Sequence, residues 1–179
     1  PKEKLPTYGI FYEQRTFSAW NPGTVEETED GIPIGDLVFK TPCGIIAFEI
    51  CEDIWSPDGP MRRRAYRGAE LIINASASPF RSGVVGTRRE MVTQRAADNQ
   101  ATVAYVNMVG ANGALSFDGG SFVDQNGRML HEGKKWHHGW SITTVDLDIT
   151  STQRWQNTTW RTDCANWKGA HKPYGIVTI

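Results

Sequence analysis

The sequence predicts an α/β fold in which helices pack outside a sheet. Between residues 36 and 106, apolar runs of strand length alternate with segments that carry helix signals, in the order strand, helix, strand, helix, strand. The chain has 179 residues, of which 39% are hydrophobic, and this is enough for one domain with a substantial core. No apolar run approaches the ~20 residues that a membrane span needs, so we expect a globular, soluble chain.

The first two predicted strands are residues 36–39 and 44–50, joined by a turn that contains proline and is closed by glycine. A helix is predicted next. Asp58 is its expected N-cap, Pro60 lies in its first turn, and Gly68 ends it. This helix would separate two strands of the sheet.

Residues 71–74 form a continuous apolar run, which is typical of a strand covered on both faces. Thr87 and Glu90 have the spacing of a capping box and predict the start of a second helix that continues to about Asn99. Residues 102–106 are the next predicted strand. These elements complete the alternation that indicates the α/β class.

The later part of the chain has weaker signals. Residues 116–123 and 127–130, separated by a polar turn, predict a hairpin, and residues 141–148 predict a last strand. From residue 149 the chain becomes polar and rich in tryptophan, which favours an irregular docked tail or a connection between domains over a core helix. Three tryptophans are spread over this tail: Trp155, Trp160 and Trp167. Residues 164–179 carry no defined structural signal.

Charge and cysteine content exclude several classes of protein. A net charge of −1 argues against a nucleic-acid binder, which needs a surplus of Lys and Arg, and the basic run at residues 62–67 is predicted to be a solvated helix face. Cys43, Cys51 and Cys164 have neither a disulfide-framework nor a zinc-site spacing. With no signal peptide at the start, a reducing cytoplasm is the expected location.

A metal site is not predicted. Histidine and acidic residues do occur in the predicted hairpin and the polar loop after it, but without the cysteine or carboxylate spacing of a metal centre. We interpret them as solvated loop residues: His131, His137, His138 and Asp118.

Cys51 is the strongest candidate for chemistry. It comes directly after the apolar strand 44–50 and is followed by Glu52 and Asp53. A strand end holds a nucleophile rigidly, and a thiol becomes reactive when a base or a cation beside it favours the thiolate. The alternative is a buried cysteine that serves as a small hydrophobic residue.

Several segments together resemble the carbon–nitrogen hydrolase (nitrilase) superfamily, and within it the glutaminase domain of glutamine-dependent NAD synthetases. The resemblance runs in order from Lys2 to about Asp163. Each motif alone is weak, but their common order makes the match specific. The segments are Pro1–Glu13, Cys51-Glu52-Asp53, Asn74–Pro79, Phe117–Ser121 and Asn157–Arg161.

The resemblance implies a nitrilase-type α-β-β-α sandwich. Residues 1–148 would form the hydrolase domain, incomplete because its N-terminal strands and a helix are missing, and residues 149–179 a tail or linker towards a synthetase domain. The chain starts without methionine inside a motif that looks internal, so we expect a fragment. Uncovered sheet edges and core faces should make it fold poorly alone. The family also implies a homo-oligomer.

The family uses a Glu-Lys-Cys triad. The resemblance implies Cys51 as the nucleophile and Lys2 as the lysine, with Lys4 as a competitor that the spacing to Leu5 disfavours. The catalytic glutamate would lie upstream of the chain. Glu13 resembles the supporting glutamate that holds the lysine in place.

Substrate contacts are also implied by the resemblance. Tyr8, Glu52 and Ser78 match positions that contact L-glutamine in the family, and an acidic group with neutral donors suits a free amino acid chemically. Many relatives carry a basic residue six positions beyond this serine, where the chain has Val84. Arg81 or Arg88 could substitute as the partner of the α-carboxylate.

The implied activity is hydrolysis of glutamine to glutamate and ammonia, which would feed NAD synthesis. No ATP-pyrophosphatase loop occurs in the chain, so no cofactor is expected on it, and ATP and deamido-NAD would bind a separate synthetase domain. Two alternatives stay open. One is an amidase or nitrilase that acts on another amide, and the other is a non-catalytic assembly protein with a nitrilase-like fold.

Overall fold

The computed structural model describes residues 1–170 and 175–179, and a seven-stranded mixed sheet lies at its centre. Its strands are β3 (Val38–Thr41), β4 (Gly44–Ile50), β5 (Leu71–Ser76), β6 (Thr102–Asn107), β9 (Phe122–Gln125), β10 (Arg128–Glu132) and β11 (Ile176–Thr178). They are ordered β10-β9-β6-β5-β4-β3-β11. The central strands β4, β5 and β6 are parallel to one another, and β11 is parallel to β3. Strand β3 pairs antiparallel with β4, and β9 pairs antiparallel with both β6 and β10.

Shorter elements surround the sheet. The hairpins are β1 (Val25–Glu27) with β2 (Pro33–Gly35), and β7 (Val109–Asn112) with β8 (Leu115–Asp118). The 3-10 helices are η1 (Glu13–Arg15) and η2 (Cys51–Trp55), and the α-helices are α1 (Pro60–Tyr66), α2 (Val84–Asp98), α3 (Leu147–Gln156) and α4 (Thr158–Ala170). This order confirms the predicted α/β alternation through β6.

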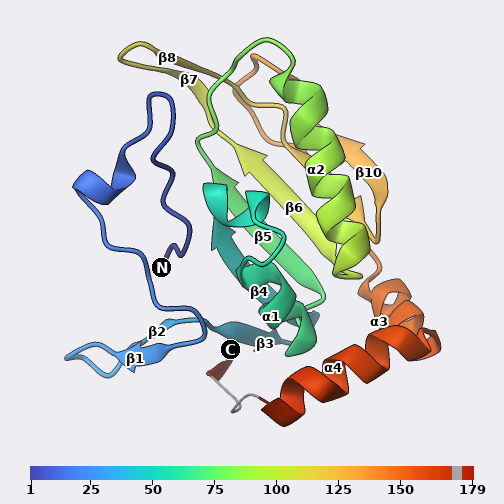
Figure 1. Ribbon diagram of the computed structural model, residues 1–179. Helices are drawn as coiled ribbons and strands as arrows, with labels where there is room; N and C mark the ends of the chain where they lie inside the picture. Colours follow the sequence, from blue (N-terminus) through green and yellow to red (C-terminus); the bar gives the residue numbers. More distant parts are fainter. Residues whose placement is uncertain (171–174) are drawn as a thin grey trace.

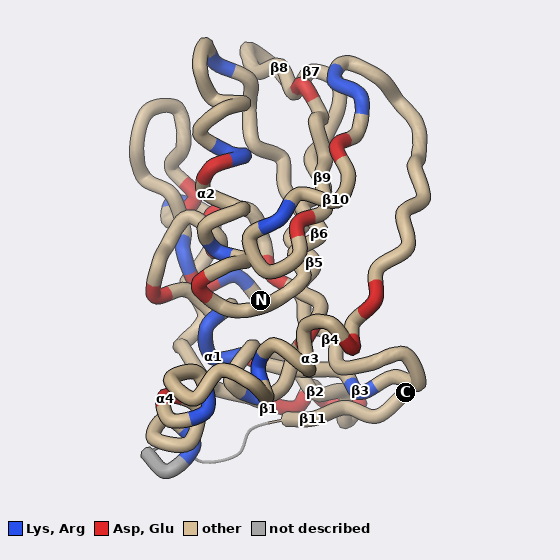
Figure 2. Tube along the Cα trace, turned by 90° about the vertical axis from the view of Figure 1, so that its right-hand side faces the viewer, with Lys and Arg blue, Asp and Glu red and all other residues tan. Residues whose placement is uncertain are grey.

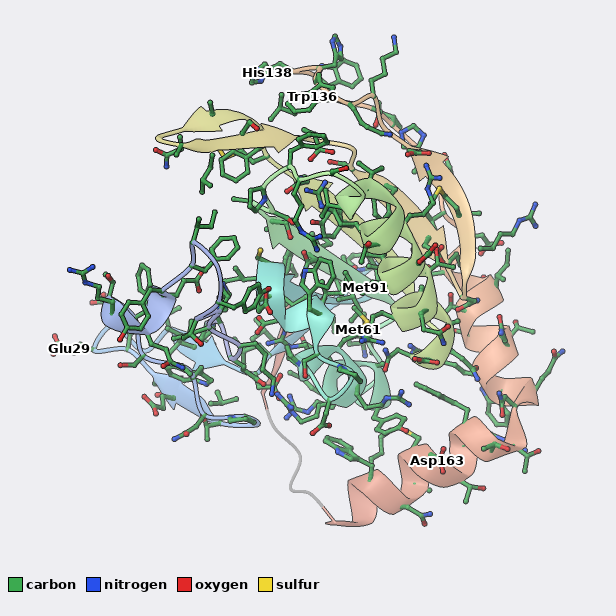
Figure 3. All side chains as sticks on the ribbon, turned by 45° about the horizontal axis from the view of Figure 1, so that its top comes forward. Glu29, Met61, Met91, Trp136, His138 and Asp163 are labelled. Atoms are coloured by element: carbon green, nitrogen blue, oxygen red, sulfur yellow. The ribbon has the colours of Figure 1, made fainter. Side chains whose placement is uncertain are left out.

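Helices α1 and α2 lie on one face of the sheet, with η2 between them (Figure 1). Alternate residues of the central strands, such as Ala47, Ile72 and Val103, point to this side and are completely buried. Met61 and Met91, from α1 and α2, pack against them in the same layer (Figure 3). The helix-covered face therefore carries the hydrophobic core.

The other face of the sheet is apolar and open among the described residues. Phe48, Ile50 and Val106 are 50%, 40% and 52% exposed. The strand register places Ile50 opposite Ala75 and Ala75 opposite Val106, so the exposed side chains are neighbours. Exposed apolar side chains of this kind are typical of a surface that binds another segment or chain, and that the domain lacks a covering part stays a prediction.

Both predicted helices start at other residues than expected. The N-cap of α1 is Gly59 rather than Asp58. Glycine is needed at this position, because a Cβ there would lie 2.4 Å from the backbone oxygen of Asp53. Helix α2 begins at Val84, three residues before the predicted cap Thr87. Gly83, with φ +78°, provides the turn, and the Thr87 hydroxyl donates back to its carbonyl at 3.3 Å.

The predicted hairpin is only partly correct. Residues 116–123 do not form one strand, because Gly119 and Gly120, each with φ +66°, break it between β8 and β9. Strand β8 pairs with β7 instead, and β9 pairs with β10 across a turn at Asn126 and Gly127.

The predicted strand over residues 141–148 is wrong. Residues 141–146 form no regular secondary structure and pair with no strand among the described residues, and Ile142 is 80% exposed. Helix α3 then begins at Leu147, because the Asp146 carboxylate caps it by accepting from the Asp148 amide at 3.0 Å. Strand-favouring side chains are insufficient without a neighbouring strand.

The region after residue 149 is docked onto the domain, as the sequence predicts for a docked tail, but it is helical. This region forms α3 and α4, and Trp160 is buried against Tyr66 of α1 with ring centroids 4.9 Å apart. The last residues then add β11 in parallel to β3. No helix of the described residues has the length and apolarity needed to cross a bilayer. Lys and Arg are scattered among Asp and Glu over the molecule (Figure 2).

Candidate active site

Cys51 lies where β4 ends and η2 begins, at the carboxyl end of the parallel strands. Its φ is +45°, in the left-handed region that side chains other than glycine seldom adopt. Such a conformation costs on the order of 1–3 kcal/mol and is found mostly at functional sites. The half-buried thiol therefore follows a turn away from the direction of β4, as a nucleophile requires.

The candidate residues line one cavity of about 690 Å³. They come from the N-terminal segment, η1, η2 and the loop after β5. The members of this group are Lys2, Tyr8, Glu13, Cys51, Glu52 and Ser78. Residues that the sequence separates by up to seventy-six positions are thus brought to one place, and Lys4 is not among those that line it.

Lys2 and Glu13 form the closest pair of charges in the cavity. The Lys2 Nζ atom lies 2.5 Å from Glu13 Oε2, and their side chains are only 13% and 27% exposed. The Lys2 carbonyl accepts a hydrogen bond from the Trp20 amide at 3.0 Å. This contact is the one that the resemblance implies for Glu13.

The groups around Cys51 shift the pKa of its thiol in opposite directions. Burial raises its pKa, while a hydrogen bond from Ser76, the charge of Lys2 and the Ala77 amide counteract this effect. The sequence analysis did not single out Ser76, although it lies within the Asn74–Pro79 segment. Its hydroxyl also bonds Asn74 Oδ1 at 2.6 Å.

Tyr8 and Glu52 form a second pair at the cavity wall. The Tyr8 hydroxyl donates to the Glu52 carboxylate, with distances of 2.8 and 3.0 Å to its two oxygens. Burial and this hydrogen bond raise the pKa of Tyr8 to about 12, and burial also raises the pKa of Glu52. The pair presents an acidic group suited to an ammonium ion.

Arg88 and Arg81 have different surroundings. Arg88 is 1% exposed and bonds the hydroxyl and carbonyl of Ser78, the Pro79 carbonyl and, at 2.7 Å, the Asp118 carboxylate. Arg81 lines the cavity together with Val84. Arg88 therefore supports the loop that contains Ser78, and Arg81 is the arginine available to a ligand.

The predicted loop residues have contacts other than metal ligation. The interpretation of Asp118 as a solvated loop residue is wrong, because Asp118 is 0% exposed and pairs with the buried Arg88. His131 bonds the Ser141 hydroxyl at 2.8 Å. His138 lies with Trp136 at the outer rim of the molecule (Figure 3). Within residues 1–170 and 175–179, no three His, Cys, Asp or Glu side chains come together as metal ligands would.

Comparison with known proteins is consistent with this geometry. The carbon-nitrogen hydrolase family model matches residues 3–157. The glutamine-dependent NAD(+) synthetase of Aquifex aeolicus is 35% identical over 161 residues, which are 89% of this chain and 26% of that protein. The chain thus spans about a quarter of the length of the curated relatives that it matches.

Solved structures show the same architecture. The carbon-nitrogen hydrolase from Helicobacter pylori G27 matches 90% of this chain and 56% of its own, with a TM-score of 0.71 and 22% identity. An amidase from Nesterenkonia sp. AN1, whose active-site cysteine carries the acetamide moiety of fluoroacetamide, matches 87% of this chain and 53% of its own. That match has a TM-score of 0.56 and 26% identity. By its sequence and its fold, this chain belongs to the carbon-nitrogen hydrolase (nitrilase) family.

Proposed function

We propose that this chain carries a cysteine-dependent glutaminase site that hydrolyses the side-chain amide of L-glutamine. The observation that carries the proposal is the meeting of the Cys51 thiol, the Lys2–Glu13 pair and the Tyr8–Glu52 pair in one cavity. Similarity to NAD synthetases supports glutamine as the amide donor. The site has room for an amino acid and offers it groups of both charges.

The proposed reaction has two stages. The Cys51 thiolate attacks the amide carbon, and the Lys2 ammonium and the Glu52 backbone N–H stabilise the oxyanion. The base that took the thiol proton returns it to the nitrogen, the C–N bond breaks, ammonia leaves, and a thioester remains. The same base then takes a proton from water as the water oxygen attacks the thioester carbon. The C–S bond breaks, that proton passes to the Cys51 sulfur, and glutamate leaves.

A general base must take the thiol proton. Of the described residues, Glu13 and Glu52 are the carboxylates that line the cavity, and each is engaged, with Lys2 and Tyr8 respectively. We therefore assign the base to the family's catalytic glutamate, outside these 179 residues. The isolated chain is then expected to be inactive.

Recognition of glutamine is assigned by charge. The α-ammonium would meet the Glu52 carboxylate, which Tyr8 orients, and Ser78 would supply a polar contact. The α-carboxylate would meet Arg81, because the usual basic position is Val84 and Arg88 is committed to internal bonds. An arginine at this wall of the cavity gives the carboxylate a bidentate partner.

The ammonia would be used in NAD synthesis by a synthetase domain of the same polypeptide or of a partner. ATP and deamido-NAD would bind there, and this chain itself would hold no cofactor. A cytoplasmic homo-oligomer is the expected setting. The length of the curated relatives supports a further domain in such proteins.

An ammonia-release assay with L-glutamine tests the proposal. We would compare this chain with a version extended upstream to include the missing glutamate, each beside its Cys51→Ala variant. Activity that needs both the extension and Cys51 is expected. A folded extended protein that releases no ammonia from glutamine, or a Cys51→Ala variant as active as its parent, would contradict the assignment.

A second candidate is an amidase for another amide. The uncharged Val84 in the cavity favours it, as does the similarity to the Nesterenkonia amidase. A screen of short aliphatic amides against glutamine distinguishes the two. The glutaminase proposal predicts the higher kcat/KM for glutamine and a loss of that preference in Arg81→Ala.

A further inference from the structure

We propose that Asp53 is a positioning residue that holds the Lys2 segment against the turn that carries Cys51. The inference rests on the proposed roles of Lys2 and Cys51. It adds a residue outside the cavity wall, because Asp53 follows Glu52 in η2 but is not among the residues that line the cavity.

One buried carboxylate joins two parts of the chain. Asp53 is 0% exposed. Its Oδ1 atom accepts from the backbone amides of Glu3 and Lys4 at 3.0 and 2.9 Å, and its Oδ2 atom accepts from the Ile50 amide at 3.1 Å. The Glu3 and Lys4 donors directly follow Lys2 in the chain, and the Ile50 donor directly precedes Cys51.

The Ile50 contact acts on the nucleophile. Ile50 is the last residue of β4, and the next residue, Cys51, has the left-handed φ of +45°. A hydrogen bond at this point holds the entry to η2 and offsets part of the strain of that conformation. The same carboxylate therefore fixes the direction of the thiol.

The Glu3 and Lys4 contacts act on the cation. Two other contacts anchor the same segment elsewhere, since Glu3 pairs with Arg63 of α1 and the Trp20 amide donates to the Lys2 carbonyl. Neither of these reaches η2. Asp53 is the side chain that sets the Lys2 backbone relative to Cys51, whose pKa the Lys2 charge lowers.

An amide cannot replace the carboxylate at this position. Asparagine has one acceptor oxygen, so its NH₂ group would face either Ile50 or the Glu3 and Lys4 amides, which are donors themselves. One side of the link would then break and leave buried N–H groups without an acceptor. Asp53→Asn keeps the shape of the side chain and removes the link.

The measurement is the pH profile of Cys51 alkylation by iodoacetamide, followed for the Cys51 peptide by mass spectrometry. The titratable groups around this thiol are Lys2, Glu52, Tyr8 and Tyr105. Exposed Cys43 serves as the internal reference in each sample. The variants are Asp53→Asn, Lys2→Met and the two combined, with Asp98→Asn as the matched control at the half-exposed end of α2.

We expect Asp53→Asn to move the Cys51 profile to higher pH and to slow alkylation at pH 8 by about three- to tenfold, since one pKa unit is a tenfold change in thiolate. Lys2→Met should do the same. In the Lys2→Met background, Asp53→Asn should add less than about a twofold change, because no ammonium remains to be placed.

An unchanged profile in Asp53→Asn, or an equal shift with and without Lys2, would overturn the inference. Loss of a nearby negative charge alone would lower the thiol pKa, so it cannot imitate the expected result. If Asp53→Asn does not fold, Lys4→Pro removes one donor from the other end of the link and must shift the profile in the same direction. Because no glutamine is used, failure of this inference is separate from failure of the glutaminase proposal.

Discussion

At the scale of single residues, the cavity places the Lys2 ammonium near a half-buried thiol. Burial raises the pKa of Cys51, and Lys2, Ser76 and the Ala77 amide offset this without becoming the leading influence. The Cys51 thiol should therefore be protonated at rest, and the proposed reaction needs a general base to remove that proton. This agrees with assigning the base to a separate glutamate.

Tyr8→Phe should weaken glutamine binding, most of all at acidic pH. The Tyr8 hydroxyl lowers the pKa of Glu52, which burial raises, so its loss leaves Glu52 less ionised as the pH falls. We expect KM for glutamine to rise about tenfold at pH 6, the effect of ~1.4 kcal/mol, with a smaller rise at pH 8 and little change in kcat. Steady-state kinetics in the form that hydrolyses glutamine would measure this.

The control for this prediction is Tyr12→Phe. Tyr12 is 65% exposed and does not line the cavity. The KM of Tyr12→Phe for glutamine should therefore match that of the parent at both pH values. Equal KM increases at pH 6 and pH 8 in Tyr8→Phe would contradict the proposed effect on Glu52.

Glu49 makes folding stability depend on pH in an unusual direction. Burial raises its pKa to about 8, against an opposing effect of Arg64. Between its ordinary pKa and about 8, the folded state holds a proton that the unfolded state has lost, so stability falls as the pH rises. Glu49→Gln should remove a slope of at most about 1.4 kcal/mol per pH unit.

Urea unfolding at pH 5.5, 6.5 and 7.5 would measure that slope. Exposed Glu29→Gln is the matched control and should keep the parent's pH dependence. A Glu49→Gln variant with the same slope as the parent would show that Glu49 is ionised in the folded protein throughout this range.

Which residues meet in the cavity could largely be predicted from motifs. Cys51 follows from its place at the end of a strand, and Lys2 and Glu52 follow from the family resemblance. The structure brings all three to one cavity, although their roles stay predictions. The choice between Arg81 and Arg88 could not be predicted. It depends on Arg88 finding Asp118 thirty residues away, and no local pattern encodes that contact.

At the scale of elements, patterns that depend on burial were more informative than patterns that depend on local capping. The apolar runs of β4, β5 and β6 predict strands because each is paired on both sides. The run 141–148 has similar side chains, but its residues find no partner strand among those described, and Asp146 starts a helix there. Tertiary partners decide such cases.

The tail helices give a stability prediction. Trp160 is 7% exposed, packs on Tyr66 and has the Arg154 guanidinium 5.1 Å from its ring centroid. We expect Trp160→Ala to lower the free energy of unfolding by about 3 kcal/mol, as for other buried aromatic residues. Trp155 is 73% exposed and is the control. Trp155→Ala should change the free energy of unfolding by less than about 0.5 kcal/mol.

Urea unfolding followed by circular dichroism would compare the two tryptophan variants. Equal effects would mean that α4 does not depend on its contact with α1. If both variants change the free energy of unfolding only slightly, the packing of Trp160 on Tyr66 does not stabilise this region.

At the scale of the whole molecule, the sheet has a helix-covered face and an open apolar face. Strands with apolar residues on both sides are typical of sheets that are buried on both sides. We therefore expect the 179-residue chain on its own to associate through the open face, or to require a covering segment.

Charges placed on the open face should suppress that association. Phe48→Glu with Val106→Glu adds two carboxylates at positions 50% and 52% exposed, where they stay hydrated in the monomer but would be buried in an assembly. Light scattering during size-exclusion chromatography should show a larger species for the parent and a monomer for the variant. Glu26→Lys with Glu29→Lys, on exposed residues of the β1–β2 hairpin region, is the charge control and should behave like the parent. If the parent is monomeric at all concentrations and does not bind a hydrophobic dye, the open face needs no covering segment or partner, and this prediction is wrong.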